Sequence, residues 1–198
     1  GILSFTPLGR LVRDRAGTAP RQPVVVVGEY DDDMHAIGAL ADGRGAGEIV
    51  GYLADLGHRR FLHVAGPPDW ASARNRRDAY LDAIARRGLE SADVIHGDWT
   101  MRSGYEAAAR LREEPGVTAV FAANDYMAMG VIRGLQDRGV RVPEDVSVFG
   151  WDDEQFAEFL SPSMSTVRVD REAQGRQAML SLLALVRGEP APRTEEGL

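Results

Sequence analysis

The chain contains the largely apolar run Arg60-Phe61-Leu62-His63-Val64-Ala65, which ends at the loop Gly66-Pro67-Pro68 and leads into a helical pattern at residues 72–87. A second run, Val24-Val25-Val26-Val27, has no polar residue at all. Apolar runs without alternation predict strands that are covered on both faces. A strand, a short loop and an amphipathic helix in this order are typical of a parallel sheet with crossover helices.

The same unit recurs along the chain. We predict strands at residues 2–5, 23–28, 60–65, 119–122, 146–150 and 165–169. Amphipathic patterns predict helices at about residues 47–56, 72–87, 102–113, 125–138 and 172–186. Gly57, Gly88 and Gly139 follow three of these helices, where glycine commonly ends a helix. The fold class is therefore α/β.

Composition narrows the classes of function. The 198 residues are 44% hydrophobic and 27% charged, as in a globular protein with one large domain or two small lobes. A net charge of −7 does not favour DNA binding by this segment itself. The absence of cysteine excludes disulfides and thiolate metal sites. The sequence shows neither a membrane span nor a signal peptide at residues 1–5.

The sequence carries no motif that supports catalysis or metal binding. There is no nucleophile elbow, phosphate-binding lysine loop or Cys/His pair, so we expect no enzyme and no cofactor. The four histidines lack paired ligand spacing, and Asp31-Asp32-Asp33 lacks the alternating carboxylates of a calcium loop. The glycines at 43, 45 and 47 do not match a dinucleotide fingerprint, and we expect them to provide backbone freedom.

Polar residues directly after the predicted strands are the candidate ligand contacts, because open α/β sheets bind ligands beyond the carboxyl ends of their strands. They include a cation, an aromatic platform, an amide and a carboxylate, a mixture that suits a polar ligand that does not react. The candidates are Ser72, Arg74, Arg76, Trp99, Asn124 and Asp152.

Each candidate also has a structural interpretation. The arginines could be a solvated helix face, Trp99 could be a packing residue, and Asn124 could be a helix N-cap. The adjacent carboxylates of Asp152 and Asp153 could suggest acid/base chemistry, but consecutive residues point in different directions. We therefore expect Asp152 to accept hydrogen bonds from vicinal hydroxyls.

At these residues the sequence resembles the LacI/GalR family of transcriptional regulators. The resemblance rests on six motifs in order across nearly the whole chain, among them Ser72-Ala73-Arg74-x-Arg76, Gly97-Asp98-Trp99 and Ala123-Asn124-Asp125. The others are Ala65-Gly66-Pro67, the stretch from Val142-Pro143 to Gly150-Trp151-Asp152-Asp153, and Ser165-Thr166-Val167.

The resemblance implies two parallel-sheet lobes of the type I periplasmic-binding-protein-like architecture, joined by three crossing strands. Residues 1–40 would be a partial N-terminal lobe, 41–164 the C-terminal lobe, and 165–198 the return to the first lobe and the tail. Five candidates match the family's effector contacts, and Arg74 is a less certain neighbour; the five are Ser72, Arg76, Trp99, Asn124 and Asp152.

The resemblance also implies a function and partners. A small-molecule effector, expected to be a sugar with a purine as the alternative, would bind in the cleft between the lobes and change the affinity of a homodimer for operator DNA in the cytoplasm. The family's helix-turn-helix module and the first strands of the first lobe are missing before Gly1. Ala41-Asp42 stands where the family commonly has Asp-Asn, and Glu29 stands near an acidic contact of many members, so effector contacts there stay open.

Two other functions compete with this interpretation. A secreted solute-binding protein for transport shares the same architecture, although the Val142-Pro143 and Ser165-Thr166 motifs favour the regulator. An enzyme that acts on a sugar or nucleoside, with Asp152 or Asp153 as its base, is the third.

Overall fold

The computed structural model describes residues 2–4, 24–26, 43–111 and 114–190, and the chain divides into two compact units. Residues 42–169 form the larger unit, and residues 1–41 with 170–198 form the smaller one. The aspartates 31–33, Glu29 and Ala41-Asp42 lie outside the described residues.

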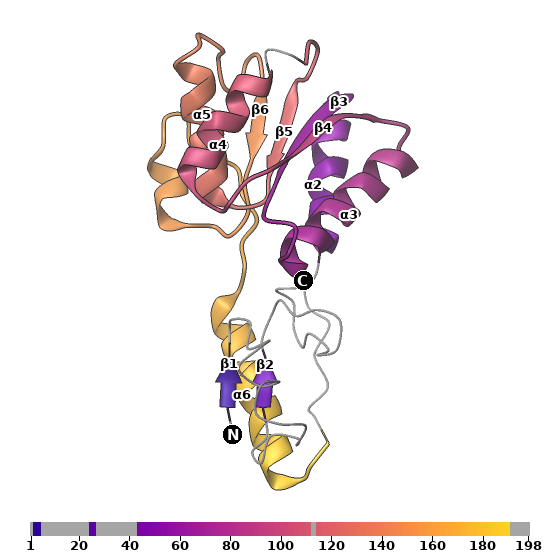
Figure 1. Ribbon diagram of the computed structural model, residues 1–198, viewed down its shortest axis with the longest axis vertical. Coiled ribbons are helices and arrows are strands. Elements are labelled where there is room, and N and C mark those ends of the chain that lie inside the picture. The colour runs from indigo at the N-terminus through magenta and orange to yellow at the C-terminus, as the bar shows by residue number, and fades with distance from the viewer. Residues whose placement is uncertain (1, 5–23, 27–42, 112–113, 191–198) are drawn as a thin grey trace. The chain divides into compact units, whose positions relative to one another are not determined.

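The larger unit is a parallel four-stranded sheet in the order β4-β3-β5-β6. The strands are β3 (Arg60–Ala65), β4 (Glu90–His96), β5 (Ala119–Ala122) and β6 (Ser147–Phe149). Helices α2 (Arg44–Asp55) and α3 (Ala71–Arg86) cover one face, and α4 (Met101–Arg110) and α5 (Asp125–Gln136) cover the other (Figure 1). This arrangement confirms the predicted α/β class with crossover helices.

Both faces of the central strands are buried, which explains the apolar runs. Phe61 and Phe121 pack with α2 and α3, whereas Leu62 and Val120 pack with α4 and α5. Side chains alternate between the faces of a strand, so a strand with a helix layer on each side has no polar face.

The predicted strands differ from the structure at two places. The strand β4 is missing from the prediction, because Glu90, Asp93 and partial exposure give this edge strand no continuous apolar run. The strand predicted at residues 165–169 is not formed; Ser165 and Arg168 make isolated parallel bridges instead. This segment follows the short 3₁₀ helix η3 (Gln155–Phe159) and makes only these two bridges to the strand end and the turn after it.

The glycines serve two different purposes. Gly57, Gly88 and Gly139 have φ angles of 106°, 62° and 76°, which confirms them as helix-ending residues in the left-handed region. Gly43 is different, because it has φ −83° at the N-cap of α2. A Cβ on Gly43 would lie 2.2 Å from the Asn75 carbonyl oxygen, so the expectation of backbone freedom was wrong there and close packing requires the glycine.

The smaller unit contains β1 (Ile2–Ser4) paired in parallel with β2 (Val24–Val26), and α6 (Arg171–Arg187). Asp170 caps α6 by accepting a hydrogen bond from the Ala173 amide at 2.8 Å. Ala178 and Leu182 of α6 pack against Leu3. Within the described ranges, no helix has the length and apolar character needed to cross a bilayer.

Candidate ligand-binding site

The carboxyl ends of β3 and β5 meet at the point where the strand order reverses. β4 lies on one side of β3, whereas β5 and β6 lie on the other. Arg76, in the helix after β3, donates from Nη1 to the carbonyl oxygen of Ala123, directly after β5, at 2.6 Å. Open α/β sheets place ligands at such a switch point.

Arg76 is the buried cation of this edge, with 5% of its surface exposed. Its guanidinium carbon lies 4.4 Å from the centroid of the Trp151 ring and 5.9 Å from that of Trp99. A desolvated cation over an indole face gains about 2 kcal/mol. The solvated-arginine interpretation therefore does not hold for Arg76.

Trp99 is held in a strained conformation by its neighbours. Its φ of 70° is rare for a bulky residue and costs roughly 1–3 kcal/mol, which the surroundings must offset. Asn124 Nδ2 donates to the Trp99 carbonyl oxygen at 3.0 Å. A Cβ on Gly66 would lie 2.2 Å from the Trp99 ring, so only glycine allows the indole to occupy this place.

Two buried polar atoms at this edge have no hydrogen-bond partner among the described residues. They are the Trp99 Nε1 and the Oγ of Ser72, a residue that is 1% exposed. A buried donor without a partner costs about 1–3 kcal/mol, and most buried polar groups in proteins are paired. These two atoms are therefore exceptions among the buried polar groups of the larger unit.

Asn124 is confirmed as the N-cap of α5. Its Oδ1 accepts a hydrogen bond from the Met127 amide at 2.8 Å while its Nδ2 holds Trp99. An amide group has one further N–H and one further lone pair, so this cap still has capacity for a ligand.

Asp152 lies half-buried after β6 with a φ of 121°. Its amide donates to the Val167 carbonyl oxygen at 3.1 Å. The neighbouring Asp153 has a φ of 57° and accepts a hydrogen bond from Arg168 Nε at 2.9 Å on the surface. The Asp153 carboxylate is thus engaged by Arg168, which gives no support to a paired acid/base role.

Arg74 differs from the other candidates. Its Nη1 donates to the Pro68 carbonyl oxygen at 3.0 Å, in the loop between β3 and α3. This contact fixes the loop that carries Gly66 and Trp70. We call the remaining candidates the strand-end site, which consists of Ser72, Arg76, Trp99, Asn124 and Asp152.

Sequence reasoning missed several residues around the strand-end site. The Trp70 ring meets the Trp99 ring edge to face, with 5.9 Å between centroids and 71° between planes. Trp151 lies under Arg76. The chain has three tryptophans, and all three gather here. Each tryptophan follows the end of a strand, and this shared position in the sequence could have indicated that Trp70 and Trp151 lie at the same edge as Trp99.

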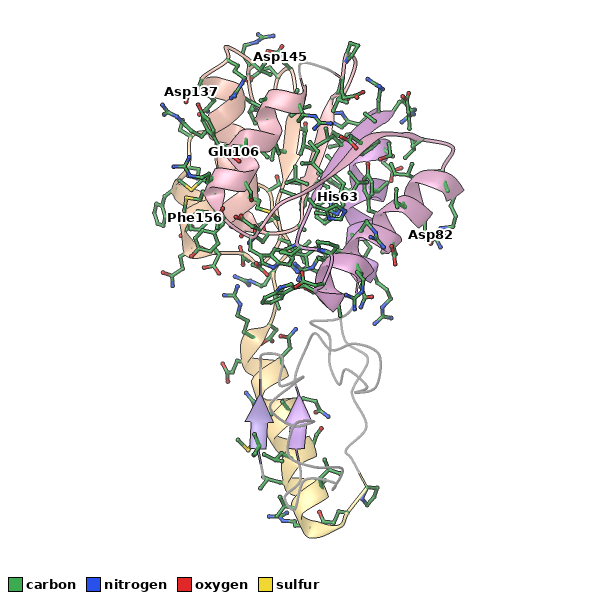
Figure 2. The ribbon with its side chains drawn as sticks, in the orientation of Figure 1. His63, Asp82, Glu106, Asp137, Asp145 and Phe156 are labelled. Atoms are coloured by element: carbon green, nitrogen blue, oxygen red, sulfur yellow. The ribbon has the colours of Figure 1, made fainter. Side chains whose placement is uncertain are left out.

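The sheet interior next to the site contains a neutral histidine. His63, which Figure 2 labels within the sheet, stacks between Tyr80 and Phe121 at centroid distances of 4.8 and 4.6 Å. Burial lowers the pKa of His63 to about 3, although a hydrogen bond from Nδ1 to the Phe121 carbonyl oxygen opposes this effect. Across the ranges that the structure covers, no group of three or more His, Asp or Glu residues could hold a metal ion.

Comparison with known proteins gives consistent matches. Residues 50–197 match the family model of the periplasmic binding protein-like domain. The probable HTH-type transcriptional repressor ExuR of Bacillus subtilis is 33% identical over 88% of this chain and 53% of its own length. The chain spans about half the length of the curated relatives it matches.

Two crystal structures of transcriptional regulators have a similar fold. A sugar-binding transcriptional regulator of the LacI family from Escherichia coli, complexed with phosphate, has a TM-score of 0.77 at 28% identity, over 88% of this chain and 64% of that one. The Lac repressor dimer bound to operator and the anti-inducer ONPF has a TM-score of 0.76 at 30% identity, over 84% and 51%. The relatives are regulators of transcription.

Proposed function

Because the chain belongs to the periplasmic binding protein-like family, as the effector-binding core of a LacI/GalR-type regulator, we propose that it senses a sugar at the strand-end site. Two buried donors that lack a hydrogen-bond partner within the described ranges, Ser72 Oγ and Trp99 Nε1, carry this proposal. Sugar hydroxyls both donate and accept hydrogen bonds, so they would satisfy these atoms while an indole face covers the ring.

The charged groups support the same ligand class. Arg76 and Asp152 offer a fixed donor and an acceptor at one edge, which suits an array of vicinal hydroxyls. We propose no catalytic role for the carboxylate. Operator DNA would be bound by a helix-turn-helix segment outside this sequence, and the protein would act in the cytoplasm, where that DNA is.

A thermal-shift screen tests the ligand proposal. The panel contains D-glucose, D-ribose, maltose, cellobiose, D-glucuronate, adenosine and inorganic phosphate. A sugar at about 100 times its Kd stabilises the native state by about 2.7 kcal/mol, which raises the melting temperature by roughly 5–10 °C for a chain of this size. We expect a sugar to produce this shift.

The matched variants are Asp152→Ala and Asp145→Ala. Asp145 is paired with Arg141 at the opposite end of the sheet, with 2.9 Å between Arg141 Nε and Asp145 Oδ2. The Asp152→Ala variant should lose the sugar-induced shift, whereas Asp145→Ala should keep it. An equal shift in both variants contradicts the proposed site, and turnover of any panel compound would favour an enzyme.

We also propose that the chain forms a homodimer through an apolar surface over α4 and α5. The Tyr126 and Phe156 rings contact each other at a tilt of 57° with 5.2 Å between centroids, and Phe159 is 79% exposed. Met101 and Tyr105 of α4 are exposed on the same pair of packed helices. We propose a second copy of this chain as the partner that covers this surface, because the similar Lac repressor structure is a dimer.

Sedimentation velocity tests the dimer. Phe159→Ser should shift the chain towards the monomer, because it removes the most exposed apolar ring of the surface. Tyr52→Ser is the control, since Tyr52 is 57% exposed on α2, which covers the other face of the sheet. Equal self-association of both variants contradicts this surface.

A further inference from the structure

We propose that Asp125 is a positioning residue that holds the turn at residues 150–154 and thereby presents Asp152 to the ligand. This inference rests on the proposed function for the role of Asp152. The turn has two consecutive residues with positive φ, Asp152 and Asp153, neither of which is glycine. Such a conformation persists only where the surroundings enforce it.

Asp125 supplies that enforcement from a fully buried position at the start of α5. Its Oδ2 accepts a hydrogen bond from the Glu154 amide at 2.8 Å. Its Oδ1 accepts one from the Thr166 hydroxyl at 2.6 Å. Its own amide donates to the Trp151 carbonyl oxygen at 2.9 Å. One residue therefore binds the turn at both of its ends.

The close approach of this carboxylate depends on Gly150. A Cβ at that position would lie 2.2 Å from Asp125 Oδ1, so a side chain there would push the carboxylate away. Glycine at the end of β6 is thus part of the same arrangement.

Thr166 extends the arrangement to the segment at residues 165–168. Its Oγ1 accepts a hydrogen bond from the Asp153 amide at 3.2 Å while donating to Asp125. The Asp152 amide donates to Val167, and the Gly150 amide donates to Ser165, at 3.1 and 2.8 Å. All three amides of residues 152–154 are held by Asp125 or by residues 166 and 167.

This arrangement has a consequence for signalling. The segment at 165–168 leads along the chain to Asp170, where the smaller unit resumes. A ligand that binds Asp152 and shifts it therefore affects the hydrogen bonds between the turn and the segment that connects the two units. Allosteric coupling between two sites needs an element whose conformational equilibrium both sites influence, and the segment at 165–168 is placed to be that element.

Amide hydrogen exchange of the ligand-free 198-residue chain tests the positioning directly. Thr166→Val removes the hydroxyl that donates to Asp125, and Thr166→Ser keeps it. The control Thr118→Val makes the same change at a threonine whose hydroxyl contacts His58 Nδ1 at 2.8 Å, away from the turn. We expect exchange at residues 152–154 to be roughly tenfold faster in Thr166→Val, and near wild type in Thr166→Ser and Thr118→Val.

Titration with maltose, cellobiose and D-ribose, followed by tryptophan fluorescence, tests the effect on binding. The sugar that binds the wild type should bind Thr166→Val and Asp125→Asn about tenfold more weakly, and Thr118→Val and Thr166→Ser with unchanged affinity.

The two measurements separate the possible failures. Unchanged exchange at 152–154 in Thr166→Val, or equal acceleration throughout the larger unit, overturns the positioning role. Faster exchange confined to the turn, with no sugar bound by the wild type, supports the positioning and contradicts the sugar proposal instead. Faster exchange with unchanged sugar affinity overturns the link from Asp125 to the ligand.

Discussion

The two ends of the larger unit's sheet carry similar side chains but differ in how these are paired. At the amino end, Arg60 Nε donates to Glu90 at 2.7 Å and its Nη2 donates to Glu114 at 2.9 Å. His58 and Thr118 pair beside them. At the carboxyl end, Ser72 Oγ and Trp99 Nε1 are buried without a partner among the described residues.

The two ends therefore differ in the pairing of their polar groups more than in polarity itself. Both ends have arginine, acid and hydroxyl groups, so composition alone does not distinguish them. The amino end satisfies these groups with neighbouring side chains, and the pairs there stabilise the fold modestly. The carboxyl end keeps desolvated donors that have no partner in the described part of the chain, and our proposal is that a ligand satisfies them.

Replacing the arginine at each end is the strongest test of this comparison. Arg76→Ala removes the cation–π contacts and the hydrogen bond to Ala123, and should lower the free energy of unfolding by about 3 kcal/mol. The same variant should lose sugar-induced stabilisation. Arg60→Ala should have a much smaller effect on stability and none on ligand response. Urea unfolding with and without the bound sugar measures both; equal losses would remove the distinction between the two ends.

The second prediction concerns His63, a buried polar residue between the two ends of the sheet, and its effect on the pH dependence of stability. Its native pKa is about 3 and its ordinary value is 6.5, so between these pH values the unfolded chain binds a proton that the native chain does not. Stability should therefore fall as the pH falls below 6.5, by up to about 1.4 kcal/mol per pH unit.

The variant His63→Phe should flatten this dependence, because it removes the titrating group and keeps a ring between Tyr80 and Phe121. Urea unfolding from pH 7.5 down to about pH 4.5 is the measurement, over a range that includes the onset expected from the unfolded pKa. An unchanged slope in the variant would show that other groups cause the pH dependence.

Glycine-to-alanine changes at Gly66 and Gly175 compare a crowded position with an open one. In Gly66→Ala, the new Cβ would meet the Trp99 ring, and overpacking of this kind costs about 1–3 kcal/mol. Tryptophan fluorescence should shift and sugar affinity should fall. Gly175→Ala, inside α6 with no atom of the described residues within 4 Å of the added Cβ, should instead stabilise the chain by about 0.5–1 kcal/mol. An unshifted spectrum in Gly66→Ala would mean that Trp99 is not packed on this glycine.

Several features of the fold were predictable because short-range physics decides them. The run at 60–65 is a strand, Asn124 is an N-cap, and Gly57 ends a helix, each from the chemistry of a few adjacent residues. The strand β4 was not predictable from periodicity, because an edge strand tolerates Glu90 and Asp93. The segment that begins at Ser165 has a strand-like composition. It accepts hydrogen bonds from the amides of Gly150 and Asp152, but it does not form the continuous ladder of a strand.

The sequence determined the fold class and the kinds of side chain that follow each strand, since both depend on local periodicity and chain order. Only the tertiary structure decided which of those side chains meet. Arg76 lies against Trp151 and Trp99, and Asp125 against Thr166, across dozens of residues of chain. Whether a polar atom is paired or left for a ligand depends on packing between distant segments, and no local pattern encodes it.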